Sequence, residues 1–109
     1  MTIIEVIKNK KQFLSLLLLA DEQENMIDRY LERGTMYVLN DNGVKAECVV
    51  TDECNGILEI KNIATVPEYQ GKGYAKALID FIVKEYADKY SVLQVGTGDS
   101  PLTVPCLLY

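Results

Sequence analysis

Residues 70–76 have the composition of an anion-binding turn that leads into a helix, and they read Gln-Gly-Lys-Gly-Tyr-Ala-Lys. Gly71 and Gly73 allow the backbone to approach a ligand without a Cβ atom in the way. The free N–H groups and the dipole at the start of a helix attract an anion. Lys72 and Lys76 lie where helices normally favour acidic residues, which suits a multiply charged anion. The alternative is an ordinary turn with solvated lysines.

Two common phosphate-binding patterns do not fit this turn. The sequence G-x-x-x-x-G-K-[ST] is absent. Lys76 stands where the dinucleotide-binding pattern G-x-G-x-x-G requires its third glycine. The pattern Q/R-x-x-G-x-G/A does fit, with Gln70, Gly73 and Ala75 at its three defined positions.

The N-terminal third of the chain predicts one strand followed by two helices. Residues 2–7 are rich in β-branched side chains, which favours a strand, and residues 11–20 have a helical pattern. Asp21 with Glu24 three residues later resembles a capping box, so we expect a second helix to begin at Asp21. Gly34 is expected to end this helix in a left-handed conformation.

The remainder of the chain predicts three consecutive antiparallel strands, a long helix and a further strand. Turn sequences at 40–43 (Asn-Asp-Asn-Gly) and 53–56 (Glu-Cys-Asn-Gly) separate the three strands, and Pro67 ends the last of them. The most regular helical spacing of apolar residues lies between Ala75 and Tyr86. The predicted strands are 36–39, 45–50, 57–66 and 92–95. This order indicates a mixed α/β domain.

Composition narrows the possible chemistry. The 109 residues contain no His, which removes Ser-His-Asp and Cys-His nucleophiles and His-ligated zinc. A net charge of −5 argues against a nucleic-acid partner and weakly favours a cationic one. Cys48, Cys54 and Cys106 lack C-x-x-C spacing and are interpreted as reduced core thiols of a cytoplasmic protein. The longest apolar run, 16–20, is too short to span a membrane.

The turn and its surroundings resemble the GNAT family of N-acetyltransferases. The pattern at Gln70, Gly73 and Ala75 directly follows residues 62–67 (Asn-Ile-Ala-Thr-Val-Pro), and residues 95–100 (Val-Gly-Thr-Gly-Asp-Ser) are similar to the fifth-strand region of small bacterial members. The resemblance covers almost the whole chain. It implies a single α/β (α+β) domain over residues 1–109, with a mixed, largely antiparallel sheet flanked by helices. Against the family pattern, the domain lacks its last helix and C-terminal strands.

The resemblance also implies direct transfer of an acetyl group from acetyl-CoA to a primary amine of a small molecule or protein, without a metal. The pyrophosphate of acetyl-CoA would lie on backbone N–H groups of residues 71–76, and the pantetheine arm would pair with the fourth strand like an added strand. The expected cofactor-binding residues are Ile63, Ala64, Thr65, Gln70, Gly71, Lys72, Gly73, Tyr74, Ala75 and Lys76.

Two catalytic residues follow from the resemblance. Glu59 on the fourth strand is the expected base; the alternative is an outward-facing carboxylate beside Lys61, and Glu47 is a second candidate base. Tyr109 is the expected acid; the alternative is a terminal Tyr without a catalytic role. Asp99 stands near the position of an asparagine that often contacts the cofactor in the family, which puts that contact in doubt.

A second functional hypothesis is a truncated or degenerate GNAT domain that binds CoA, or associates with itself, without efficient catalysis. Missing C-terminal strands would leave the fifth strand at the edge of the sheet. An unpaired strand edge invites pairing with another chain. This predicts a homodimer through that edge, and no nucleic-acid or membrane partner is expected.

Overall fold

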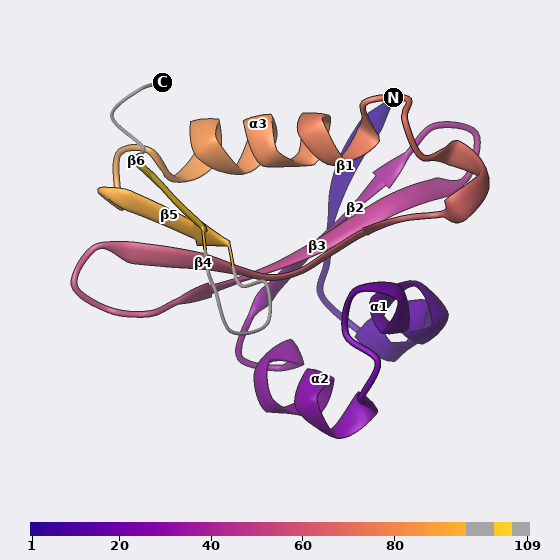
Figure 1. Cartoon of the computed structure of the whole chain (residues 1–109), viewed down its shortest axis with the longest axis horizontal. Coiled ribbons are helices and arrows are strands. Elements are labelled where there is room, and N and C mark those ends of the chain that lie inside the picture. Colours follow the sequence, from indigo (N-terminus) through magenta and orange to yellow (C-terminus); the bar gives the residue numbers. More distant parts are fainter. Residues whose placement is uncertain (96–101, 106–109) are drawn as a thin grey trace.

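The computed structural model describes residues 1–95 and 102–105. Six strands form one sheet in the order β1-β2-β3-β4-β5-β6 (Figure 1). Neighbouring strands are antiparallel except β4 and β5, which are parallel. The strands are β1 (Thr2–Val6), β2 (Thr35–Asn40), β3 (Val44–Asp52), β4 (Ile57–Thr65), β5 (Val92–Val95) and β6 (Leu102–Pro105). The expected mixed, largely antiparallel sheet flanked by helices is confirmed.

Helices cover both faces of the sheet. The 13-residue α3 crosses one face, and α1 and α2 cover the other (Figure 1). The α helices are α1 (Leu14–Ala20), α2 (Glu24–Leu31) and α3 (Tyr74–Tyr86), with 3-10 turns at η1 (Lys10–Phe13) and η2 (Pro67–Tyr69). Because side chains alternate along a strand, β2 supplies both cores: Leu39 packs against the α3 side, and Met36 packs against the α1 and α2 side. In the described part of the chain, no helix is long and apolar enough to cross a membrane.

The local sequence signals for the central strands and the long helix are confirmed. The turn between β2 and β3 holds Asn42 and Gly43 at φ values of 56° and 108°, and the Gly43 N–H donates to Asn40 Oδ1 over 2.8 Å. Asn and Gly tolerate these left-handed values, so the turn specifies the hairpin. Strands β4 and β5 are parallel because α3 carries the chain back across the sheet.

The predicted start of the second helix is wrong. Helix α2 begins at Glu24, and its N-cap residue is Gln23, which makes no side-chain cap hydrogen bond. The Asp21 carboxylate instead accepts hydrogen bonds from the Gln23 N–H at 3.4 Å and the Tyr30 hydroxyl at 3.2 Å. The capping-box pattern predicted that the Asp21 carboxylate would accept a hydrogen bond from the first turn of the helix. It accepts one from the Tyr30 hydroxyl instead.

The end of α2 also differs from the prediction. Gly34 has no positive φ; a Cβ atom there would lie 2.9 Å from both the Tyr30 carbonyl oxygen and Val49 Cγ1. Glycine is therefore required for close packing. Lys10 binds the chain where α2 ends. Its buried ammonium donates to the carbonyl oxygens of Leu31 and Gly34 over 2.8 Å each. A positively charged side chain stabilises the C-terminus of a helix, which is the negative end of the helix dipole.

Strand β6 pairs antiparallel with β5, in a register that runs from Val92↔Pro105 to Val95↔Leu102. The expectation that the fifth strand forms an open edge is therefore wrong, and the dimer argued from that edge loses its basis. The cysteine prediction is partly wrong: Cys48 is buried, but Cys54 is exposed in the turn between β3 and β4. The predictions for residues 96–100 with Asp99, for Cys106 and for Tyr109 lie outside the described residues.

Candidate functional site

Strand β4 has a free edge over its second half. Strand β5 pairs only with residues 57–60 of β4, so within the described residues the edge from Lys61 to Thr65 has no strand partner on that side. On the opposite side, the pairing with β3 shifts between Val49 and Val50, which leaves Lys61 as an extra residue. A bulge of this kind increases the local twist of the strand. The free edge offers backbone donors and acceptors to an extended ligand.

The anion-binding turn follows β4 directly. Gly71 and Gly73 have φ values of 80° and 86°, and Gly73 is the N-cap of α3 without a side-chain cap hydrogen bond. These left-handed values strongly favour glycine. Of the residues that the structure describes, none beyond the immediate neighbours has an atom within 4 Å of a Cβ built at either position, so the backbone there is open to a ligand. The first turn of α3 contains no acidic residue.

The free edge and the turn line one cavity of about 350 Å³. It holds nine of the ten cofactor-binding residues expected from the sequence. The exception is Lys72, whose ammonium lies 5.7 Å from the centre of the Tyr69 ring. Lys76 lines the cavity and forms an ion pair with Asp80 at 2.9 Å. The lining residues are Leu19, Ile63, Ala64, Thr65, Tyr69, Gln70, Gly71, Gly73, Tyr74, Ala75 and Lys76.

The hairpin between β2 and β3 braces the turn. The Tyr74 hydroxyl donates to Asp41 Oδ2 over 2.7 Å, and this hydrogen bond raises the pKa of Tyr74. Lys45 places its ammonium 4.0 Å from the centre of the Tyr69 ring, a cation–π contact. The sequence did not predict roles for Asp41 and Lys45. Only the fold brings Asp41 next to Tyr74 and Lys45 next to Tyr69.

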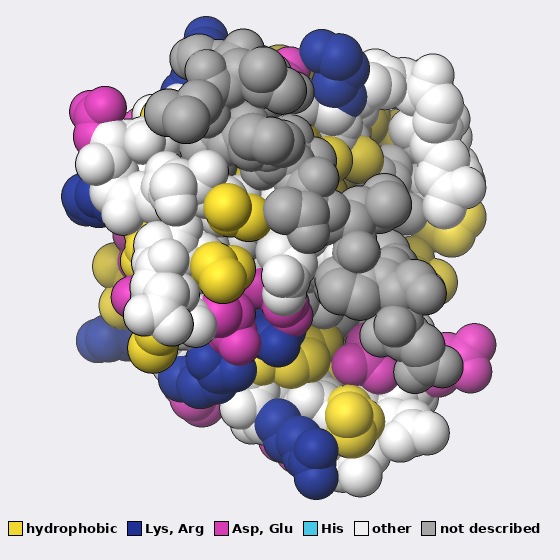
Figure 2. All heavy atoms as spheres, turned by 60° about the vertical axis from the view of Figure 1, so that its left-hand side comes forward, with side chains coloured by type: hydrophobic (Ala, Val, Ile, Leu, Met, Phe, Trp, Pro, Cys, Tyr) yellow, Lys and Arg dark blue, Asp and Glu magenta, His cyan; other side chains and the backbone are white. Residues whose placement is uncertain are grey.

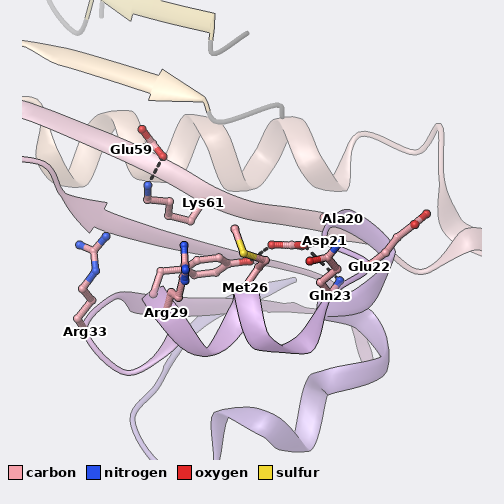
Figure 3. A pocket seen from close by; sticks show the side chains of 10 residues that line it. Ala20, Asp21, Glu22, Gln23, Met26, Arg29, Arg33, Glu59 and Lys61 are labelled. Atoms are coloured by element: carbon pink, nitrogen blue, oxygen red, sulfur yellow. Dashed lines mark hydrogen bonds and ion pairs between the residues drawn. The ribbon is translucent and has the colours of Figure 1, made fainter. Parts of the chain in front are cut away.

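A larger cavity of about 690 Å³ lies between α2, the connection from α1 to α2, and β4 (Figure 3). Acidic and basic side chains both line it. In the space-filling view, such side chains gather in the lower half of the molecule, where α2 lies (Figure 2). The lining residues are Ala20, Asp21, Glu22, Gln23, Met26, Arg29, Tyr30, Arg33, Glu59 and Lys61.

Glu59 belongs to this larger cavity and is 8% exposed. Its Oε2 lies 2.6 Å from the Lys61 ammonium, and its Oε1 accepts a hydrogen bond from the Gln94 side-chain amide. The carboxylate thus lines a cavity, as the expected base would, and it also forms the ion pair with Lys61 that the alternative expected.

The two cavities adjoin along one strand. Glu59 and Lys61 of β4 line the larger cavity, whereas Ile63, Ala64 and Thr65 line the smaller one. At the end of α1, Leu19 lines the smaller cavity and Ala20 the larger one. An extended ligand on the free edge of β4 would therefore end beside a second ligand in the larger cavity.

Glu47, the second candidate base, lines neither cavity. It is 0% exposed, and its two carboxyl oxygens have no hydrogen-bond partner in the described part of the chain. Burial raises the pKa of Glu47 to about 8. It pairs with Val38 on β2, and paired residues share a face of the sheet, so Glu47 faces α1 and α2.

On the same face, Asn62 connects the interior to the larger cavity. Its side-chain amide donates to the Leu17 carbonyl at 2.9 Å and to the Tyr30 hydroxyl at 3.0 Å. Burial raises the pKa of Tyr30 to about 12, which keeps its hydroxyl neutral. Sequence reasoning gave no role to the side chain of Asn62 or to Tyr30, because each side chain gains its partners only through tertiary packing.

A family model described as an acetyltransferase (GNAT) domain matches residues 32–103. The Bacillus subtilis (strain 168) protein "Uncharacterized N-acetyltransferase YvbK" is 33% identical over 93 residues, which make up 84% of this chain and 60% of that protein. The chain therefore spans about three fifths of the length of this relative.

Solved structures show the same fold. An IAA acetyltransferase from Bacillus cereus ATCC 14579 is 36% identical with a TM-score of 0.77, over 91% of this chain and 68% of that one. A GNAT family acetyltransferase from Elizabethkingia anophelis, solved with acetyl-CoA bound, is 32% identical with a TM-score of 0.81, over 91% and 66% of the two chains. A Bacillus subtilis acetyltransferase in complex with CoA is 32% identical with a TM-score of 0.77, over 90% and 66%.

Proposed function

The chain belongs to the GNAT acetyltransferase family, and we propose that it transfers the acetyl group of acetyl-CoA directly to a primary amine of a small molecule or a protein. The observation that carries this proposal is the free edge of β4, which leads from a glycine-rich turn into a second, polar cavity. Similar solved structures that hold acetyl-CoA or CoA support the choice of acetyl donor.

The smaller cavity suits the long, anionic shape of CoA. The pyrophosphate would accept hydrogen bonds from N–H groups of residues 71–76 at the start of α3. The amide groups of the pantetheine arm would pair with the backbone of Ile63, Ala64 and Thr65, in the manner of strand addition. Leu19 offers an apolar wall beside this edge. This arrangement would place the thioester at the boundary between the two cavities.

The proposed reaction needs no nucleophile from the protein. The lone pair of the acceptor amine attacks the thioester carbonyl carbon, a C–N bond forms, the C–S bond breaks, and the amine proton leaves as the thiolate gains one. Glu59 is the proposed proton acceptor, because its carboxylate lines the larger cavity on β4. Its ion pair with Lys61 fixes the position of the carboxylate on the cavity wall. Tyr109 remains the proposed acid.

Calorimetric titration with acetyl-CoA tests whether the chain binds this acetyl donor, which is the first step of the proposed reaction. We expect one molecule to bind per chain, and Gly73→Asp should abolish binding because it adds bulk and negative charge at the proposed pyrophosphate site. Gly56→Asp is a matched control, since it adds the same charge at another left-handed glycine, in the turn between β3 and β4 and outside the cavity. Absence of binding by the unmodified chain at millimolar acetyl-CoA would contradict the proposal.

A second candidate function is CoA binding without efficient turnover. The observation that favours it is the engagement of Glu59 by both Lys61 and Gln94. Release of free thiol from acetyl-CoA on a panel of amines separates the two functions. An acetyltransferase releases thiol with at least one amine, and Glu59→Gln lowers that rate while acetyl-CoA binding persists. A chain that binds acetyl-CoA but releases no thiol with any amine is a binding module.

A further inference from the structure

We propose that the acceptor is an amino carboxylate, a molecule that carries a carboxylate in addition to the amine that is acetylated. This inference rests on the proposed function, because it concerns the acceptor cavity of the same site. It is based on the charges of the larger cavity, which are of opposite sign at its two ends and are not paired with one another.

The cationic end of the cavity consists of Arg29 and Arg33 on α2 with Lys61 on β4. All three side chains extend into the space between the helix and the strand (Figure 3). Two of them are already compensated: Arg33 lies 3.3 Å from Glu53 Oε2, and Lys61 lies 2.6 Å from Glu59 Oε2. Among the described residues, no carboxylate lies within ion-pair distance of Arg29. Arg29 is therefore a cation on the cavity wall without a counter-ion in the described part of the chain.

The acidic end consists of Asp21 and Glu22 in the connection between α1 and α2. Within residues 1–95 and 102–105, the Asp21 carboxylate accepts hydrogen bonds from the Tyr30 hydroxyl and the Gln23 N–H. No cationic side chain of the described residues forms an ion pair with Asp21 or Glu22. This connection directly follows Leu19 and Ala20, where the two cavities meet. Asp21 and Glu22 therefore adjoin the smaller cavity from the helix side, as Lys61 does on β4.

Side chains of both charges line this one cavity, which suits a ligand that carries both an ammonium and a carboxylate group. Asp21 and Glu22 would attract the amine end of such a molecule, and its carboxylate could reach the guanidinium of Arg29. Arginine binds carboxylates through two parallel hydrogen bonds. A phosphate fits less well, because its second negative charge would meet the acidic side chains of the same cavity.

The same charges disfavour a different class of acceptor. A diamine or polyamine would bring a second cation towards Arg29, Arg33 and Lys61, where no described carboxylate remains unpaired to receive it. The net charge of −5 weakly favoured a cationic acceptor, but the distribution of charge inside the cavity argues against one. Local charge at a contact outweighs net charge because screening limits exposed charges to about 10 Å at 0.1 M salt.

The test compares matched acceptors in the thiol-release assay. Glycine, β-alanine, 4-aminobutyrate and 6-aminohexanoate are each paired with the corresponding neutral amide, and 1,4-diaminobutane is added as a dication. We expect kcat/KM for the best carboxylate to exceed that for its amide by about tenfold, and the diamine to be the poorest acceptor. Equal values for carboxylates and amides, or preference for the diamine, would overturn the proposal.

Variants of Arg29 separate charge recognition from a general loss of activity. Arg29→Gln should lower kcat/KM about tenfold for the carboxylate acceptor and less than twofold for its amide. Lys84→Gln removes an exposed cation of α3, on the opposite face of the sheet, and should change neither value. An equal loss with both acceptors in Arg29→Gln would contradict a role for Arg29 in binding the carboxylate.

Binding measurements distinguish this inference from the proposed function. If acetyl-CoA binds but no amine is acetylated, each carboxylate acceptor is titrated into the CoA-saturated protein. Binding that Arg29→Gln weakens about tenfold supports the inference even without turnover. Failure of every carboxylate to bind at tens of millimolar overturns the inference and leaves acetyl-CoA binding intact, whereas failure of acetyl-CoA to bind refutes the proposed function itself.

Discussion

Replacement of Glu47 by Gln should flatten the pH dependence of the protein's stability. The side chain is 0% exposed, and its carboxyl oxygens have no hydrogen-bond partner among the described residues. Burial raises the pKa of Glu47 from 4.5 to about 8. At neutral pH the folded chain therefore holds a proton on Glu47 that the unfolded chain has released.

The size of the effect follows from proton linkage. Between pH 4.5 and about 8 the folded chain binds more protons than the unfolded chain, so the free energy of unfolding falls as the pH rises. Each pH unit in this window costs about 1.4 kcal/mol, which amounts to about 3 kcal/mol at pH 7. Gln has the same shape but cannot ionise. Its buried amide would lack partners among the described residues just as the neutral carboxyl does, so this cost is nearly the same in both chains.

The variant should therefore be about as stable as the unmodified chain at pH 5 and more stable at pH 8. Urea unfolding, followed by circular dichroism at four pH values between 5 and 8, gives the difference in the free energy of unfolding at each pH. We expect this difference to change by about 1 kcal/mol per pH unit. Glu85→Gln, at an exposed position of α3, is the matched control and should change the free energy of unfolding by less than about 0.5 kcal/mol. A difference for Glu47→Gln that does not change with pH would refute the assignment of a buried, neutral carboxyl.

Three further substitutions test the packing and the bracing of the site. Gly34→Ala should lower the free energy of unfolding by about 1–3 kcal/mol in urea titrations, because the new Cβ would lie 2.9 Å from the Tyr30 carbonyl oxygen; an unchanged value would contradict the close packing. Lys10→Met should cost about 1–3 kcal/mol in the same assay, because two buried carbonyl oxygens lose their donor. Tyr74→Phe should weaken acetyl-CoA binding several-fold in calorimetry and leave thermal stability nearly unchanged, because it releases the turn from Asp41; equal affinity would show that this bond does not position the turn.

The sequence predicted those elements whose signals are local. The turn at Asn42 and Gly43 needs left-handed backbone values that few residues adopt, and α3 has a regular apolar spacing, so both were identified correctly. Strand β6 was missed because it is a four-residue segment that depends on pairing with β5. The start of α2 was misplaced because the carboxylate of Asp21 is held by Tyr30, and such a tertiary contact leaves no periodic pattern.

The two cavities of the site also differ in how much of their lining the sequence predicts. The proposed CoA cavity is built from two neighbouring stretches of sequence, 63–65 and 69–76 together with Leu19, so a short motif identifies most of its lining. The proposed acceptor cavity joins Arg29 and Asp21 to Glu59 on β4, about thirty or more positions away. Only the packing of α2 against β4 brings these charges to one wall, and no spacing in the sequence indicates it.

Titration of isotope-labelled protein with CoA, observed through backbone amide NMR signals, tests the central claim most directly. That claim is that the free edge of β4 and the turn before α3 form one binding site. The account predicts saturable shifts at one equivalent for the amides of Ile63, Thr65, Gly71 and Gly73, with little change at Gly56 in the turn between β3 and β4. Unchanged signals at Ile63, Thr65, Gly71 and Gly73, or shifts confined to other parts of the chain, would contradict it.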